Sequence, residues 1–273
     1  MAVYLRVIVS SESEAPWVLL NCLEMPRWVR AMLLYEPNAT NLGKPKEVVF
    51  PKILDGFDPS LSERIRYRVL DILSESDPSL TDAAIELNEQ SVRHGFTRLF
   101  ALKPWDIVIC VDADEIIHRT SYRRIVLGVL KFGSVQLGLR QFMFRANYIW
   151  QDFIFYAPTA SFYGLYSHKP YSHWRYKGRK LSGIVGSHFS FVMTIDQMLE
   201  KLARYRHAVD NERFADRQQL EAAVKNKRYI FEPDRQVKFV ELTRTALSDR
   251  RSIYPSSFEI VESLLEGRFS DVW

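Results

Sequence analysis

The sequence predicts an α/β fold in which a mainly parallel central sheet is flanked by helices. Segments that have the pattern of strands alternate along the chain with segments at helical spacing, which is typical of strand–helix–strand units. In addition, the apolar run 107–111 reads as a strand buried on both faces, as strands are inside a parallel sheet. That run ends abruptly in the carboxylates of Asp112, Asp114 and Glu115, at the edge of the sheet where such folds bind ligands.

Length and composition favour one domain. The chain has 273 residues, 47% of them hydrophobic, which is enough for one large core. We expect a single domain over 1–273, made of a first half at 1–115, a second half at 116–210 and a C-terminal packing segment at 211–273. The net charge of +4 suits an enzyme that handles anionic nucleotides, but it is too small to indicate a nucleic-acid partner.

Cysteine content and hydropathy bear on the compartment. Cys22 and Cys110 do not make a disulfide framework, so a reducing compartment is expected. Residues 1–10 have the pattern of a first strand and not of a signal sequence. No apolar run approaches the roughly 18 residues that span a bilayer. We therefore expect a cytoplasmic protein with no integral membrane segment.

The first half contains elements with recognisable start and stop signals. Ser60 and Glu63 have the spacing of a capping box, and apolar residues follow them at helical intervals. Pro37, Asn38 and Gly43 indicate a loop. The patterns predict strands at 4–10, 31–35 and 48–50, helices at 16–25, 61–73 and 81–100, and a loop at 37–43.

The first half ends with the strand that leads to Asp112, and the second half continues with a helix over 122–132. Residues 135–139 alternate as a strand, and the apolar phase then shifts, which predicts a bulge near Arg140 and Gln141. We expect residues 146–180 to be aromatic and irregular, 183–192 to form a strand, and Thr194 to open a helix. The last 60 residues are mixed and are expected to pack onto the main domain.

The carboxylates after the central strand have two interpretations. Asp112 and Asp114 share a face because side chains alternate along a strand, and paired carboxylates suit a hard divalent cation and, through it, a diphosphate. The alternative is a strand-end turn in which Asp112 caps a following helix. Glu115 is expected either to support the pair from behind or to face a helix dipole.

Four segments resemble glycosyltransferase family 17, the family of the β-1,4-mannosyl-glycoprotein N-acetylglucosaminyltransferases. The loop after the second predicted strand is similar to the family's Glu-Ser-x-x-Thr-x-x-Gly-x-Pro-[Lys/Arg] loop, and the last segment is similar to a Gly-Trp-His-Cys-Ser-Trp segment. The segments are 36–46, 63–70, 93–116 and 186–191, and the resemblance covers roughly 4–210. The chain departs from the family at Ile117, where the family has Pro, and at Ser187 and Phe189, where it has Trp and Cys.

This resemblance implies a GT-A-type fold and a metal-dependent inverting transferase that moves a sugar from a UDP-sugar, most simply UDP-GlcNAc, to a glycan acceptor. Asp112 and Asp114 would hold Mn²⁺ or Mg²⁺, with Asp112 also able to contact the ribose, and His188 would be a further ligand or else a hydrogen-bonded core histidine. Residues 1–115 would bind the nucleotide-sugar and 116–210 the acceptor. Without an anchor or stem, the source is expected to be bacterial or viral. Other donors (UDP-xylose or UDP-glucose) and a non-catalytic nucleotide-sugar or glycan binder remain alternatives.

Further residues are assigned to the donor by the same resemblance. The loop that follows the second strand supplies the pocket candidates Glu36, Asn38, Gly43 and Lys46, whose alternative is an ordinary polar loop. Arg93 is either a diphosphate ligand or the partner of Glu89 four residues earlier. The basic and aromatic run 169–180, which contains Arg175, has three interpretations: a lid over UDP, a solvated loop, or a nucleic-acid patch. We expect no nucleic-acid partner.

The acceptor hydroxyl needs a base, and a carboxylate is expected to take its proton. Asp152 is the first candidate because it follows the bulged strand and lies next to aromatic residues. Asp210 and Glu212 are the alternatives.

Overall fold

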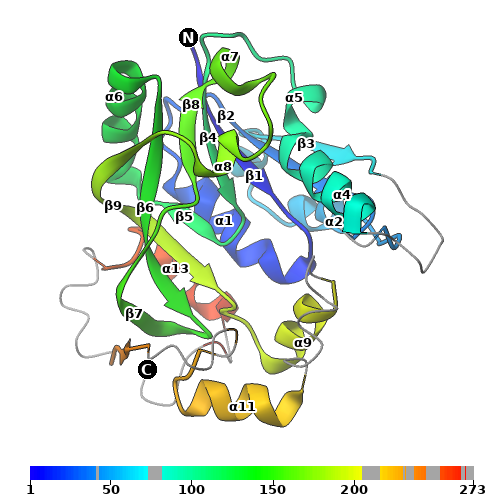
Figure 1. Cartoon of the computed structure of the whole chain (residues 1–273), viewed down its shortest axis with the longest axis vertical. Coiled ribbons are helices and arrows are strands. Elements are labelled where there is room, and N and C mark those ends of the chain that lie inside the picture. The colour runs from blue at the N-terminus through cyan, green and yellow to red at the C-terminus, as the bar shows by residue number, and fades with distance from the viewer. Residues whose placement is uncertain are drawn as a thin grey trace.

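The computed structural model describes residues 1–40, 43–72, 82–204, 216–229, 231, 237–243, 253–265 and 268. A central sheet runs through the molecule with helices on both faces (Figure 1). Its main path has the order β10-β7-β6-β8-β4-β1-β2-β3, and β9 joins it through β6 while also pairing with β5.

The N-terminal half of the sheet is parallel. It contains β1 (Val3–Ile8), β2 (Ala31–Pro37), β3 (Ile65–Leu70) and β4 (Ile107–Asp112), with β1 in the centre between β2 and β4. Every residue of β1 and β2 is buried, which explains their nearly continuous apolar sequences. This half therefore matches the predicted parallel sheet.

The rest of the sheet is mostly antiparallel. It contains β5 (Glu115–Ile117), β6 (Ser134–Met143), β7 (Arg145–Phe155), β8 (Thr159–Phe162), β9 (Arg179–Ser190) and β10 (Phe239–Glu241). β8 runs antiparallel to both β4 and β6. Among the described residues of this half, β6 with β9 is the one parallel pairing. The α/β class and the central sheet flanked by helices are confirmed, but the sheet is mixed and mainly parallel only in its first half.

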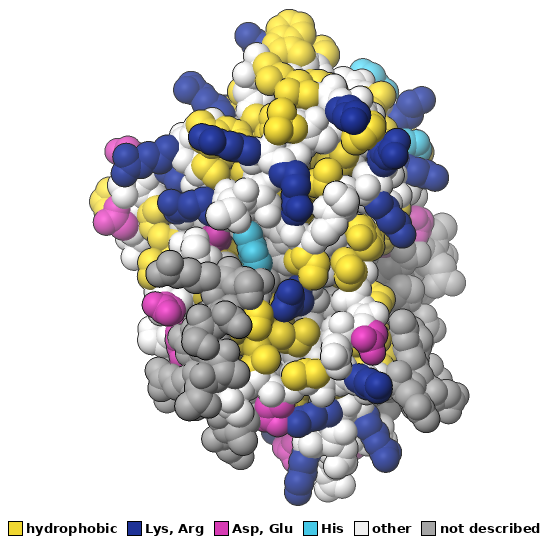
Figure 2. Space-filling model, turned by 90° about the vertical axis from the view of Figure 1, so that its left-hand side faces the viewer, with side chains coloured by type: hydrophobic (Ala, Val, Ile, Leu, Met, Phe, Trp, Pro, Cys, Tyr) yellow, Lys and Arg dark blue, Asp and Glu magenta, His cyan; other side chains and the backbone are white. Residues whose placement is uncertain are grey.

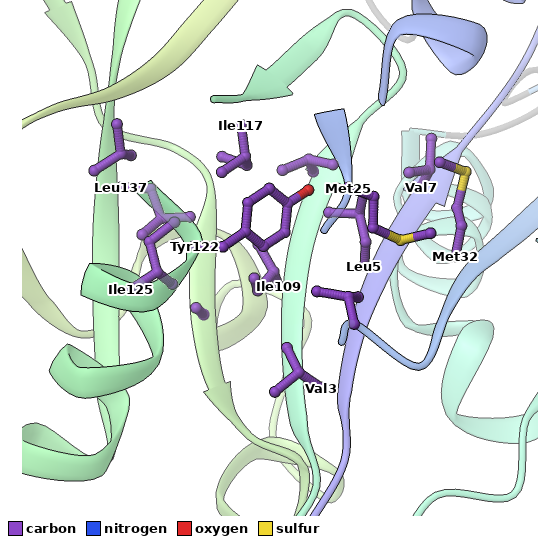
Figure 3. Packing of buried hydrophobic residues seen from close by; sticks show 14 of the residues in the cluster. Val3, Leu5, Val7, Met25, Met32, Ile109, Ile117, Tyr122, Ile125 and Leu137 are labelled. Carbon is purple, nitrogen blue, oxygen red and sulfur yellow. The ribbon is translucent and has the colours of Figure 1, made fainter. Parts of the chain in front are cut away.

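Two groups of helices cover the two faces. One face packs against α1 (Ala15–Glu24), α2 (Phe50–Asp55) and α6 (Tyr122–Phe132). The other face packs against α4 (Asp82–His94), α5 (Phe96–Leu99), α7 (Tyr163–Tyr166) and α8 (His173–Tyr176). Figure 3 shows the first face, where Leu5 and Ile109 of neighbouring strands meet Tyr122 and Ile125 of α6.

Shorter elements and the described C-terminal parts complete the fold. They are η1 (Glu12–Glu14), α3 (Pro59–Ser62), η2 (Arg119–Ser121), α9 (Ile195–Arg204), α11 (Arg217–Lys225), α13 (Phe258–Glu262) and η5 (Ser263–Leu265). Phe258 stacks near Phe189 of β9, and β10 extends the sheet beside β7. No helix among the residues that the structure describes is long and apolar enough to cross a membrane.

Three predicted elements are wrong and one is interrupted. The helix predicted over 61–73 is instead the short α3 followed by strand β3, because pairing with β2 outweighs the local helical spacing. The strand predicted at 48–50 is the approach to α2, and the irregular segment predicted at 146–180 contains all but the first residue of strand β7. The helix predicted over 81–100 ends at His94 and resumes at Phe96, around Gly95.

The bulge predicted near Arg140 is confirmed. The register between β6 and β7 shifts between Arg140 and Phe142, where two residues of β6 face a longer stretch of β7. The bulge lies next to Gln141, which contacts a site histidine described below.

Candidate active site

The carboxyl ends of three parallel strands meet at one edge of the sheet. Asp112, the last residue of β4, lies opposite Ile8 of β1, and Ile8 lies opposite Tyr35 of β2. Glu36, the residue after Tyr35 in β2, therefore lies at the same edge of the sheet. Ligands of open α/β sheets gather at such edges, so the local topology places Asp112 where the sequence predicted.

Asp112 is surrounded by guanidinium groups. Arg93 Nη1 donates to both of its carboxylate oxygens, at 2.8 and 3.0 Å, and Arg175 Nη2 lies 3.1 Å from Oδ2. Arg6 Nη1 lies 3.8 Å from Oδ1. Burial would raise the pKa of Asp112, but Arg175, Arg93 and Arg6 together hold it well below its usual range. Asp112 is thus a fixed anion that organises three cations, and it does not cap a helix.

Glu115 supports this cluster from inside the protein. Its side chain is fully buried and receives both terminal nitrogens of Arg175, one of them at 2.8 Å. One of its oxygens also accepts the backbone N–H of Asp112 at 2.9 Å. A bidentate pair of this kind has the most favourable geometry for a buried ion pair. Glu115 therefore holds Arg175 and the Asp112 backbone in place together.

Asp114 faces a separate set of partners. Its Oδ1 lies 3.7 Å from His188 Nε2, and its Oδ2 lies 3.4 Å from Lys201 Nζ on α9. His188 Nδ1 is hydrogen-bonded to Gln141 Oε1 at 2.8 Å, so Nε2 is the ring atom that faces Asp114. Burial lowers the pKa of His188, although Asp114 and Glu115 oppose that shift, and the neutral ring has a lone pair for a ligand.

The donor atoms around Asp114 fit a divalent cation in part. One carboxylate and one imidazole are ligands that Mn²⁺ accepts, and the Gln141 contact to the second ring nitrogen is the support that metal-binding histidines usually have. Among the residues that the structure describes, no three His, Cys, Asp or Glu side chains converge as a metal site. Asp112 is engaged by arginines, so this chain offers Asp114 and His188, and a phosphate-bearing ligand would complete the coordination.

Three charged residues of the site were not predicted from the sequence. Arg6 is 1% exposed inside β1, Lys201 lies on the helix after β9, and Glu14 ends η1. Burial raises the pKa of Glu14 to about 7. Lys201 lowers this pKa, whereas Asp114 and Asp112 raise it further. A charged residue inside the otherwise apolar strand that contains Arg6 was a signal that could have been used. Glu14 and Lys201 come together only through the tertiary fold.

The predicted donor-pocket residues form a tight structural cluster. Glu36 is fully buried, pairs with Lys46 Nζ at 2.5 Å and accepts the hydroxyl of Tyr67 at 3.0 Å. Asn38 donates to Asp71 and accepts the backbone N–H of Ile72. These contacts connect the loop after β2 with β3. The described residues of this loop are therefore held in place by hydrogen bonds and lie at the edge of the candidate site.

The remaining candidates have different positions. Gly43 has φ of 74°, a left-handed conformation that favours glycine. Asp152 is exposed on β7, and strand alternation points it away from the face of Phe155, whose ring lies 4.1 Å from His188. Asp210 and Glu212 lie outside the described residues.

The basic and aromatic run 169–180 reaches the site through one residue. Trp174 is fully buried in the second core cluster, between Phe96 and Tyr166, and it anchors α8 against the sheet. Arg175, the next residue, reaches Asp112 and Glu115. The part of the run that contains Trp174 is therefore core, and Arg175 lies beside the carboxylates of the candidate site.

Comparison with known proteins identifies a family. The model of the family described as Glycosyltransferase family 17 matches residues 2–253. No curated protein sequence matches the chain.

Two kinds of solved structure resemble the fold. A crystal structure of S. aureus TarS 1–349 has a TM-score of 0.35 and 11% identity over 52% of this chain. A crystal structure of 4-diphosphocytidyl-2C-methyl-D-erythritol synthase has a TM-score of 0.38 and 11% identity, covering 68% of this chain and 90% of its own. This chain spans 36% of the TarS 1–349 chain and 22% of a second, longer TarS chain.

Proposed function

This chain belongs to glycosyltransferase family 17, and we propose that it is a metal-dependent inverting transferase that moves a sugar from a UDP-sugar to a glycan acceptor. UDP-GlcNAc is the simplest donor, because it is the one that the family resemblance implies. We expect the donor to bind at the carboxyl edge of the sheet, because the parallel half ends there at the Asp-x-Asp segment.

One observation carries the proposal. Two carboxylates and one histidine lie beside four cationic side chains at the end of β4. Arg93, Arg175 and Lys201 each reach a carboxylate of the Asp-x-Asp segment, and Glu115 and Glu89 pair with the same arginines. The side-chain charges therefore nearly balance, and a bound divalent cation would add the positive charge that a diphosphate requires. Guanidinium groups match phosphate oxygens in a bidentate manner, which favours a nucleoside diphosphate over a neutral ligand.

The residues that would hold the metal are Asp114 and His188. A divalent cation bound there would stabilise negative charge on a diphosphate leaving group. Asp112 keeps Arg93 and Arg175 aimed at the same edge, and Gln141 keeps the His188 ring oriented. In this proposal Asp114 and His188 bind the metal, and Asp112 holds the arginine side chains in position.

Titration calorimetry with UDP, in the presence and absence of Mn²⁺, tests this assignment. Asp114→Ala and His188→Ala are each expected to weaken UDP binding by about 10–100-fold with Mn²⁺ present and to have little effect in EDTA. Asp196→Asn, an exposed carboxylate on α9, is the matched control and should bind UDP like the wild type. Equal weakening with and without metal would show that Asp114 and His188 only support the fold.

A release assay for UDP across UDP-GlcNAc, UDP-xylose and UDP-glucose would identify the donor. Turnover with a glycan acceptor and analysis of the new linkage would then establish the stereochemistry. A protein that binds these nucleotides in a metal-dependent way but never releases UDP would be a binder, which would contradict the proposal.

The base remains a choice between carboxylates. From the sequence, Asp152 is our first candidate, with Asp210 and Glu212 as alternatives. The structure directs Asp152 away from the face of Phe155 and His188, and it adds Glu14, whose pKa of about 7 suits proton transfer near neutral pH. Loss of the base should lower turnover by roughly 10²–10⁴-fold and leave donor affinity intact. Steady-state kinetics of Asp152→Asn, Asp210→Asn, Glu212→Gln and Glu14→Gln would identify it, and normal turnover in Asp152→Asn would remove our first candidate.

A further inference from the structure

Charge is divided very unevenly along this chain. Between Ile116 and Ile195 the sequence has eleven Lys or Arg residues and a single acidic residue, Asp152. The whole chain has 37 basic and 33 acidic residues, so the remainder has an excess of acidic ones. A small net charge therefore conceals a strongly basic segment, which includes α6 and the strands beside it.

Helix α6 has an outward face that is both apolar and basic. Its inner face is buried through Tyr122, Ile125 and Val129. On the outside, Leu127 is 65% exposed and Leu130 is 50% exposed. Arg123 and Arg124 lie about one turn before Leu127, and Lys131 lies about one turn after it. Single exposed leucines are common on protein surfaces, but two of them one turn apart become informative when further exposed apolar residues adjoin them.

The exposed apolar residues continue beyond α6. Phe132 and Leu165 are 39% and 46% exposed, and Leu165 lies against the glycine that ends the helix, with Cδ2 3.6 Å from where a Cβ of Gly133 would be. Trp105, which is 55% exposed, lies further along the same edge. The Gly164 N–H donates to the carbonyl of Pro104 at 2.8 Å, and this bond brings the residues just before Leu165 and Trp105 together. We call this set of exposed residues the α6 surface: Leu127, Leu130, Phe132, Leu165 and Trp105.

Cations lie directly over the aromatic rings of the α6 surface. The guanidinium of Arg179 is 4.6 Å and the ammonium of Lys131 is 5.2 Å from the ring centre of Phe132. Lys103 Nζ is 5.9 Å from the ring centre of Trp105. Figure 2, which faces the side of the molecule that contains α6, shows Lys and Arg side chains spread among hydrophobic ones over its upper half.

We propose that the α6 surface binds the surface of a lipid bilayer that contains anionic headgroups. Leu127, Leu130 and Trp105 would enter the boundary between headgroups and acyl chains, and the surrounding cations would contact lipid phosphates. Exposed leucines distinguish this partner from a nucleic acid, which has no hydrocarbon region to receive them. This inference goes beyond the transferase activity and does not depend on the donor or the metal.

The position of the α6 surface leaves the candidate active site accessible. Trp105 lies two residues before the start of β4, whereas Asp112 ends that strand. Six residues of strand separate the two by roughly 20 Å. A protein bound through the α6 surface therefore still presents the Asp-x-Asp edge to the surrounding solution, and membrane binding and UDP binding should be independent of each other.

Vesicle flotation with the whole chain tests the proposal. The wild type should float with vesicles made of equal parts phosphatidylcholine and phosphatidylglycerol, weakly with pure phosphatidylcholine, and less as salt is added. Leu127→Gln/Leu130→Gln should reduce the partition coefficient by roughly tenfold or more, because two apolar side chains no longer insert. Arg123→Gln/Lys131→Gln should reduce it by roughly fivefold for each charge removed.

Controls separate this effect from misfolding and from other partners. Ile260→Gln changes a residue that is 59% exposed on α13, next to Glu259, and should leave flotation unchanged. Thermal melting and UDP affinity should be the same in all variants. No flotation of the wild type, or equal flotation of the double leucine variant, would overturn the proposal. So would retention of a homopolymeric RNA that the charge variant loses and the leucine variant keeps, since that pattern indicates a nucleic-acid surface.

Discussion

Arg175 is the residue on which the candidate site depends most. Its guanidinium joins Asp112 to Glu115, and its side chain is only 7% exposed. Both carboxylates raise its pKa further above the usual arginine value, against the desolvation that burial causes. Because Glu115 is completely buried, it has no access to water if its partner is removed.

Removal of the Arg175 guanidinium is therefore expected to destabilise the whole protein. Arg175→Met should lower the free energy of unfolding by about 3–5 kcal/mol, since it leaves a buried carboxylate unpaired. The double variant Arg175→Met/Glu115→Leu should recover much of that loss, and urea unfolding would measure both. Arg175→Lys keeps the charge but not the bidentate geometry, so its free energy of unfolding should lie between those of the single and the double variant. A double variant no more stable than Arg175→Met would contradict this account.

At the scale of elements, the pairing of β5 with β9 places the two halves of the site together. Glu115 lies opposite His188 in this pairing, and Ile117 lies opposite Gly186. The two strands approach so closely at Gly186 that a Cβ there would be 2.1 Å from the carbonyl oxygen of Ile116. Only glycine fits at this contact, because a backbone atom cannot move aside as the end of a side chain can.

Gly186→Ala should force β5 and β9 apart. Overpacking usually costs about 1–3 kcal/mol, and a clash with backbone should place this variant at or above the upper end of that range. We also expect weaker Mn²⁺-dependent UDP binding, because the distance between Asp114 and His188 depends on the same pairing. Gly56→Ala is the matched control, since a Cβ there meets only Ile53 O at 3.4 Å, and it should change stability by less than about 1 kcal/mol. Chemical denaturation and calorimetry would show whether the two variants differ in this way.

At the scale of the whole molecule, partly buried histidines should make the fold sensitive to acid. Burial lowers the pKa of His118 to about 4, with Arg140 adding to the effect and Glu24 opposing it, and burial also lowers the pKa of His94. Between that value and the unfolded pKa of about 6.5, the folded chain binds fewer protons than the unfolded chain. The free energy of unfolding should therefore fall as the pH falls through this window.

His118→Gln should remove part of that pH dependence. One pKa unit corresponds to about 1.4 kcal/mol, so His118 is expected to account for a loss on the order of 3 kcal/mol between pH 6.5 and 4. Urea unfolding at several pH values in this window would give the slope for the wild type and for the variant. His168→Gln, at an exposed position, is the control and should retain the wild-type slope. Identical slopes for His118→Gln and the wild type would show that other groups cause the acid sensitivity.

The amino-acid sequence by itself determined the local features whose cause is local. The apolar run of β4, the Asp-x-Asp segment at its end, the bulge near Arg140 and the family were all recognisable there, because each depends on neighbouring residues or on a spacing of motifs. Only the tertiary structure decided the partners of the charges. Pairing with β2 made a strand of residues 65–70 in spite of their helical spacing. Arg6 and Glu14 lie in the N-terminal segment and Lys201 lies on α9, all far along the chain from Asp112 and Asp114. No periodicity relates them, so their approach to these carboxylates arises from the folded sheet alone.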